Sequence, residues 1–232
     1  MAIAYDNASS VASIAGQGGF SWSHTIGSGS NRVLIVCFQT YIDITLPTMS
    51  VTYNDVALTQ VGTVNYTTDD YCLAMYVLKE ANMPGTPGAY TVQVSFTESC
   101  YYGGGGSTSW TGVDQTTAAH NFASVADAST VANVASLNVT SATGEVVVDL
   151  IRYQYTMDMT TNKTLRWERP DLSGTLVAHM GSSADGAATV TMGYTVDGGS
   201  DIGYRMIGAS LKDAAAGGGP AMNLVYRSIH TA

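Results

Sequence analysis

The chain has 232 residues, of which 45% are hydrophobic and 12% charged, and its 9 Lys and Arg against 18 Asp and Glu give a net charge of −9. This composition excludes a disordered chain, which needs low hydrophobicity and a high density of charge. It also argues against a nucleic-acid partner, because binding to phosphates needs a positively charged face and the basic residues here are scattered singly.

The length fits one all-β domain, since β-sandwiches and barrels use about 200–250 residues as a single unit. No apolar run approaches the roughly 18 residues that span a bilayer, so we expect no membrane partner. The opening sequence MAIAYDNASS lacks the basic start and apolar stretch of a signal peptide, which predicts synthesis in a cytoplasm.

Short runs rich in β-branched and aromatic residues recur along the chain between turn-forming clusters, and helical periodicity is almost absent. In chain order, the predicted strands are Phe20–Ile26, Arg32–Ile42, Met49–Tyr53, Leu58–Tyr66, Tyr71–Leu78, Ala89–Phe96, Ser107–Val113, Ala132–Val139, Glu145–Tyr153, Thr175–Gly181, Ala188–Val196 and Tyr204–Lys212. Because no helices separate these strands, βαβ units are excluded. We therefore expect an all-β fold, an antiparallel two-sheet β-sandwich of the jelly-roll or immunoglobulin-like kind.

Three local patterns make this prediction more specific. Asn54 and Asp55 stand between apolar stretches and predict a tight hairpin, because both residue types tolerate positive φ. Arg32–Ile42 and Glu145–Tyr153 are apolar nearly throughout and should be central strands covered on both faces. Lys79–Met83 is the lone helix candidate, and the proline that follows it limits it to one turn.

The composition changes abruptly after the sandwich domain, which we place at residues 1–213. Residues 214–220 read AAAGGGP and predict a flexible linker. The following arm, Ala221–Ala232, has alternating apolar residues, and we expect it to add as an extended strand to the sheet edge of a neighbouring subunit. A frayed end is the alternative. The side chains expected to make the contact are Met222, Leu224, Tyr226 and Arg227.

The residue types that carry catalysis are present but not grouped. Each histidine stands alone, no Ser lies in a GxSxG elbow, and the three Cys residues are far apart with no CxxC pair. We expect no catalytic residue, no metal site, no cofactor and buried or free thiols. Paired loop acids such as Asp69 and Asp70 leave Ca²⁺ binding open as an alternative. The run Gly103–Gly106 precedes no helix that could bind phosphate, and it is predicted to be a flexible loop.

The aromatic composition is more informative. A count of 14 Tyr against 4 Phe is an excess of rings with a polar tip, which suit protein interfaces and sugar stacking. Tyr101 and Tyr102 flank the glycine run, and Met157 and Met159 lie in the segment TMDMTT, so both places are predicted to be contact loops. Packing inside the sandwich is the alternative for all four side chains.

Five short segments carry a resemblance to a known kind of protein: Val51–Gly62 (VTYNDVALTQVG), Trp110–Thr117 (WTGVDQTT), Ile207–Lys212 (IGASLK), Ser21–His24 (SWSH) and Arg32–Val36 (RVLIV). They resemble a β-sandwich module found in virion proteins of tailed bacteriophages and in some bacterial surface proteins. The resemblance covers the chain from Phe20 to Lys212. It implies a non-enzymatic structural or binding protein and assigns no catalytic residues.

A virion protein is therefore the leading hypothesis, most simply a capsid decoration (cement) protein that covers or stabilises the shell; head-fibre and tail accessory proteins belong to the same class. It would assemble in the host cytoplasm, bind the major capsid protein or other virion proteins, and form a homo-oligomer, with a trimer favoured. The alternative is a carbohydrate-binding module that uses an exposed Trp110 or Trp167 as a stacking platform. We expect Trp110 to be buried instead.

Overall fold

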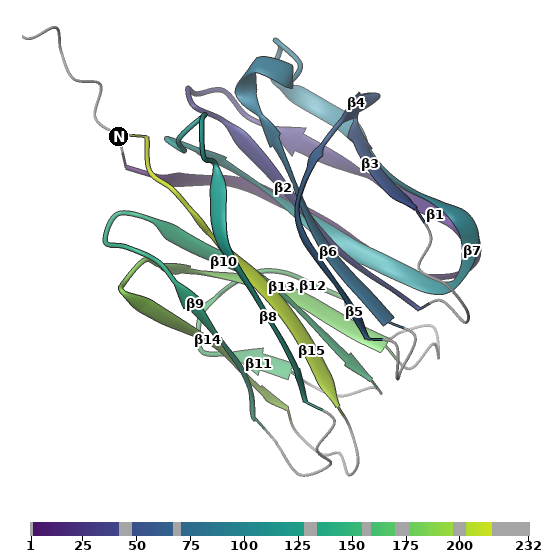
Figure 1. The fold of residues 1–232 in the computed structure, drawn as a ribbon. Coiled ribbons are helices and arrows are strands. Elements are labelled where there is room, and N and C mark those ends of the chain that lie inside the picture. Colours follow the sequence, from purple (N-terminus) through teal and green to yellow (C-terminus); the bar gives the residue numbers. More distant parts are fainter. Residues whose placement is uncertain are drawn as a thin grey trace, which may run out of the picture.

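The computed structural model describes residues 2–41, 48–66, 71–127, 134–154, 159–169, 177–196 and 203–214. These residues form antiparallel β-sheets packed together, with a single 3-10 turn at Glu80–Asn82 (Figure 1). The all-β prediction is confirmed, including the limit of one helical turn near Lys79–Met83. Among the residues described, no helix is long and apolar enough to cross a membrane.

The strands are β1 (Ala4–Ile26), β2 (Val33–Tyr41), β3 (Met49–Tyr53), β4 (Val56–Ala57), β5 (Thr59–Tyr66), β6 (Tyr71–Lys79), β7 (Gly88–Thr111), β8 (Ala119–Asp127), β9 (Val134–Thr140), β10 (Val146–Gln154), β11 (Met159–Thr161), β12 (Thr164–Arg169), β13 (Val177–Asp185), β14 (Thr189–Val196) and β15 (Tyr204–Leu211). The predicted hairpin is confirmed, because Asn54 and Asp55 have φ of 49° and 63° and connect paired strands β3 and β4.

The described strands form three hydrogen-bonded sheets, whereas the sequence predicted two. A seven-stranded sheet has the order β4-β3-β7-β2-β6-β5 with β1 beside β7, and the other two have the orders β12-β13-β10-β15-β8 and β11-β14-β9. Strands β1 and β7 are 23 and 24 residues long, and they pair with a register shift between Gln17 and Gly19. Both strands run from one layer of the molecule into the next, so the seven-stranded sheet folds over on itself (Figure 1).

Three hydrophobic cores separate the resulting four layers. The first core lies within the folded seven-stranded sheet, and its buried residues are Phe20, Trp22, Ile26, Leu34, Val36, Phe38, Val51, Tyr53, Leu58, Ala74, Tyr76, Leu78, Met83, Val92, Val94, Phe96 and Cys100. The second, which we call the seam, joins that sheet to the five-stranded sheet and contains Val33, Ile35, Cys37, Leu73, Met75, Val77, Trp110, Val113, Ala118, Val146, Val148, Leu150, Trp167, Ile207, Ala209 and Leu211. The third lies between the five- and three-stranded sheets and contains Ala135, Leu137, Val139, Val147, Ile151, Tyr153, Met180, Val190, Met192, Tyr194, Tyr204 and Met206. Successive residues of β2 and of β10 enter different cores, which confirms both as central strands covered on two faces.

The two halves of the chain, β1–β7 and β8–β15, repeat one strand arrangement. The inner strands of the first half have the order β5-β6-β2-β7-β1, and the inner sheet of the second half has the order β12-β13-β10-β15-β8. The outer strands repeat as β3-β7-β1 and β11-β14-β9. Each half is therefore a larger inner sheet covered by a smaller outer one.

Register and sequence support this internal repeat. Strand β5 shifts register after Gln60, and its counterpart β12 shifts after Leu165, at the equivalent place in the ladder. The segments GAYTV at 88–92 and GAATV at 186–190, which lead into the counterparts β7 and β14, differ at one position. The chain thus contains the same structural unit twice.

The internal repeat also relates the contacts between the two inner sheets: each contact between two strands recurs between their counterparts. Strand β5 contacts β8, while its counterpart β12 contacts β1; likewise β6 contacts β15, while β13 contacts β7. The counterparts β2 and β10 contact each other. This is the pattern of a two-fold axis passing between β2 and β10, as in a symmetric dimer, but within one chain.

The two related sides of the seam are packed by side chains of different size. On one side Gly62 of β5 lies under the ring of Phe122 of β8, and a Cβ at this glycine would clash with that ring. On the other side Trp167 occupies the register position equivalent to Gly62, and its indole lies over Gly106 and Gly181, where an added Cβ would also clash. The two equivalent positions thus carry no side chain on one side of the seam and an indole on the other, so the two sides are packed differently.

The run Gly103–Gly106 is not the flexible loop that the sequence predicted. It lies within β7, paired with β1 on one side and β2 on the other, and is buried. A Cβ added in this run would clash with the ring of Phe20 or the carbonyl oxygen of Cys37, so close approach of neighbours requires glycine here. As a result, Tyr101 and Tyr102 lie on a strand rather than in a loop.

Candidate functional site

The tyrosines predicted to make contacts belong to a group of four at one end of the inner layer of the first half. Tyr71, Tyr41 and Tyr102 lie directly opposite one another on β6, β2 and β7. The ring centroid of Tyr41 is 4.8 Å from that of Tyr71 and 6.3 Å from that of Tyr102. Tyr101 adds a fourth ring, whose centroid is 5.4 Å from that of Tyr41. We call these four residues the tyrosine cluster.

The position of the cluster follows from the strand pattern. Alternate residues of β2 and β6 face the seam, and Tyr41 and Tyr71 continue this face at the strand ends. A phenol ring extends the apolar surface there, while its hydroxyl keeps a polar tip for water or a partner. Cross-strand aromatic neighbours also stabilise the sheet, so the cluster is held in place by its own ring contacts.

Arg152 of β10 closes the inner side of the cluster. Its guanidinium carbon lies 3.3 Å from the centroid of the Tyr71 ring, a cation–π contact across the seam. Burial lowers the pKa of Arg152 to about 10, so the group remains charged at neutral pH. Within the described ranges its Nε and Nη2 atoms have no hydrogen-bond acceptor. The Tyr71 ring thus helps to stabilise this charge.

The outer side of the cluster is accessible. The side chain of Tyr101 is 49% exposed, Tyr41 and Tyr102 are half-buried, and Tyr71 is buried. Rigid rings with polar tips, partly exposed and anchored from behind, are typical of protein contact surfaces. The arrangement is suited to binding another surface.

The other predicted contact residues fall elsewhere. Met159 is half-buried and packs against the third core, which favours the packing alternative for this side chain. Met157 lies outside the described residues, as does the arm with Met222, Leu224, Tyr226 and Arg227. The three cysteines are buried, as expected.

The structure brings together a serine–histidine group that sequence spacing did not reveal. The Nδ1 atom of His24 lies 2.8 Å from Ser9 Oγ and 2.9 Å from Ser107 Oγ. Its Nε2 atom has no partner in the part of the chain that the structure describes, so no carboxylate orients the ring as a nucleophilic site requires. The imidazole is fully buried, and this group serves to pair β1 with β7.

Two buried histidines predict a loss of stability in acid. Burial lowers the pKa of His24 and of His179 to about 4, below the usual 6.5. The unfolded chain therefore binds more protons between about pH 6.5 and 4, and the free energy of unfolding should fall as the pH falls through that range. Urea unfolding across this range should show a smaller decline for His24→Asn, whose amide can replace the Nδ1 contacts. An unchanged decline would contradict a buried neutral His24.

Both tryptophans considered as sugar platforms are covered. Trp110 is 2% exposed, as expected, and Trp167 is 7% exposed. Among the described residues, no group of three or more His, Cys, Asp or Glu side chains is placed to hold a metal ion. Asp69 and Asp70, the acids of the calcium alternative, lie outside these residues.

No protein-family model and no curated protein matches this sequence.

Proposed function

We propose that this protein is a non-enzymatic structural component of a tailed-bacteriophage virion, a decoration protein that attaches to the capsid shell through the tyrosine cluster. The tyrosine cluster is the observation that carries the proposal. Four neighbouring rings, of which that of Tyr101 is the most exposed, form the kind of aromatic anchor on which protein interfaces depend. The major capsid protein is the proposed partner.

The strand order supports a finer fold assignment, which we include in the proposal. In a jelly roll, the first strand pairs with the last and the second with the one before it. In the second half, β8 pairs with β15 and β9 with β14, and the two ends of β1 pair with the two ends of β7 in the same way. Each half is thus proposed to be a jelly roll, an architecture that occurs in viral capsid proteins and in lectins.

Attachment to a shell lattice also favours an oligomer. Each chain presents one tyrosine cluster, and linking several weak contacts raises overall affinity without a new interface. A homotrimer is the state we propose, with the arm at residues 221–232 as the linking strand. Deleting this arm should then weaken self-association.

Changing Tyr101 to serine should weaken binding of the purified protein to capsid shells by about thirtyfold or more, since removal of a hot-spot aromatic costs roughly 2 kcal/mol or more. The protein should stay folded, because the ring is 49% exposed. Co-sedimentation with shells that lack the protein would measure the change. Leu165→Ser is the matched control, since Leu165 is 41% exposed and lies on β12, outside the cluster. Equal binding by both variants would contradict the proposal.

The carbohydrate-binding alternative needs an exposed indole, and both candidate indoles are buried. A glycan array remains its direct test, and we expect no binding that depends on Trp110.

A further inference from the structure

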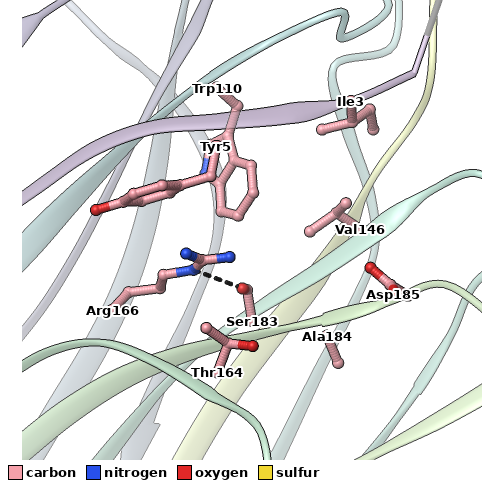
Figure 2. A pocket seen from close by; sticks show the side chains of 9 residues that line it. All are labelled: Ile3, Tyr5, Trp110, Val146, Thr164, Arg166, Ser183, Ala184 and Asp185. Atoms are coloured by element: carbon pink, nitrogen blue, oxygen red, sulfur yellow. Dashed lines mark hydrogen bonds between the residues drawn. The ribbon is translucent and has the colours of Figure 1, made fainter.

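A cavity of about 180 Å³ opens at one side of the seam, between β1 of the first half and strands β10, β12 and β13 of the second (Figure 2). Its wall combines aromatic rings, a guanidinium, a hydroxyl and a carboxylate, contributed by Tyr5, Trp110, Arg166, Ser183 and Asp185. The volume is close to that of cavities of about 150 Å³ that bind benzene, so it can hold a small molecule.

Arg166 is held in a fixed position at this cavity. Its guanidinium carbon lies 4.0 Å from the centroid of the Tyr5 ring and 5.1 Å from that of Trp110. Its Nε donates a hydrogen bond of 2.7 Å to Ser183 Oγ. Among the described residues the two terminal nitrogens have no acceptor, and the side chain forms no salt bridge. The planar end of the guanidinium is therefore oriented and available for a ligand.

Asp185 supplies the opposite charge. It lines the same cavity, and Figure 2 shows its carboxylate and the Arg166 guanidinium on opposite sides of the space. In the described part of the chain neither group forms an ion pair with the other or with a third residue. The cavity thus has a cationic wall and an anionic wall, with the charge of each unneutralised by direct contact.

The internal repeat allows these residues to be compared with their counterparts on the other side of the seam. On the related side of the seam, register places Val61, Ala119, Leu211 and Val77 at the positions of Arg166, Tyr5, Trp110 and Ser183. All four of these residues belong to or pack against the apolar seam. These four positions are thus filled by apolar side chains on one side and line a charged, partly open cavity on the other, while the position of Asp185 is taken by Lys79. Burying part of a guanidinium costs free energy, so its presence points to a binding role.

We propose that this cavity binds a small zwitterion, with its carboxylate on the terminal nitrogens of Arg166 and its ammonium on Asp185. The fork of a guanidinium matches a carboxylate, which makes two parallel hydrogen bonds with it. A simple anion suits the site less well, because Asp185 would repel it and the chain carries a net charge of −9. Amino acids are the chemical class that combines both charges within this volume.

A series of unbranched amino acids tests the proposal: glycine, β-alanine, 4-aminobutyrate and 5-aminopentanoate. Amide chemical shifts of the ¹⁵N-labelled protein should move around Tyr5, Thr164 and Arg166, and one chain length should bind best because the two walls are a fixed distance apart. Acetate and ethylammonium, each with a single charge, should bind about tenfold more weakly or worse, since each loses one charge-assisted contact.

Substitutions of the two charged residues test whether the amino acid binds in this cavity. Arg166→Gln should remove binding, and Asp185→Asn should reduce the preferred amino acid to the affinity of acetate. Arg169→Gln is the matched control, because Arg169 lies on the same strand but donates to Ser10. If Arg166→Gln fails to fold, Asp185→Asn still tests the site, because the side chain of Asp185 is exposed. Absence of shifts with every amino acid would overturn the proposal, and so would equal binding of acetate and amino acids. Capsid binding does not enter this experiment, so its outcome is independent of the proposed virion function.

Discussion

Replacing Trp167 by alanine should lower the free energy of unfolding by about 3–5 kcal/mol, the range for an indole removed from a core. Trp167 is 7% exposed and fills one side of the seam over Gly106 and Gly181. The surrounding strands are held by ladder hydrogen bonds, so they cannot collapse fully into the space that the indole leaves. The cavity term therefore adds to the lost transfer free energy.

Urea unfolding followed by circular dichroism would measure the effect. Leu165→Ala is the control, because Leu165 is a neighbour on β12 that is 41% exposed, and surface changes of this kind stay within about 0.5 kcal/mol. Since the seam joins the two halves, the Trp167 variant should still unfold in one transition, at lower urea. A loss below about 1 kcal/mol would show that the indole is not packed as described.

Replacing Asp149 by asparagine should remove a contribution to stability that weakens as pH rises, and should make the protein more stable at pH 8. Asp149 is on β10, and its Oδ1 accepts hydrogen bonds from Ser182 N at 2.7 Å, Ser182 Oγ at 3.0 Å and Tyr194 Oη at 2.8 Å. Its Oδ2 has no partner among the residues described. Burial raises the pKa of Asp149 to about 7 from the usual 3.8. The folded protein therefore keeps a proton that the unfolded chain releases.

This difference in proton binding makes the stability of the folded state depend on pH. Between about pH 4 and 7 the folded state binds more protons at Asp149, so the contribution of this group to the free energy of unfolding falls as pH rises through that window and then levels off. An asparagine oxygen can accept the same three hydrogen bonds without a charge. Asp149→Asn should thus match the parent near pH 4 and be more stable than the parent at pH 8. Thermal unfolding at both pH values checks this, and a difference between the two proteins that is the same at both would contradict it.

The histidine and aspartate effects have opposite signs in nearly the same pH window. His24 and His179 favour the folded state at higher pH, whereas Asp149 favours it at lower pH. In acid, the parent should therefore lose more stability than His24→Asn and less than Asp149→Asn. Measuring His24→Asn and Asp149→Asn separately is therefore more informative than the parent profile alone.

Periodicity in the sequence was sufficient to predict much of the fold. The apolar continuity of β2 and β10 correctly indicated strands with two covered faces, and the Asn54–Asp55 pair correctly indicated a hairpin. The first part of β1 was missed, because DNASSVAS is small and polar and lacks the β-branched pattern of a strand. The Gly103–Gly106 run was misread, because its need for glycine depends on neighbours such as Phe20 that come from other strands.

The candidate site could be predicted only in part. An excess of Tyr pointed to Tyr101 and Tyr102, but Tyr41 and Tyr71 join them only through the register of β2 with its neighbours. Tyr5 and Arg166 come from opposite halves of the chain and meet through the packing of two sheets. No local pattern encodes such a meeting. The internal repeat was also missed, since the two copies share few identical residues outside GAYTV and GAATV.

The joining of two like units in one chain has a consequence for how the molecule can diversify. Two identical subunits must carry any substitution at both related positions, so a change that helps one side is imposed on the other. A single chain escapes this constraint, and its second unit stays at a high effective concentration however dilute the protein is. One side of the seam can then specialise while the other keeps its apolar packing. The molecule thereby gains two faces of different chemistry, which a symmetric dimer of one such unit could not have.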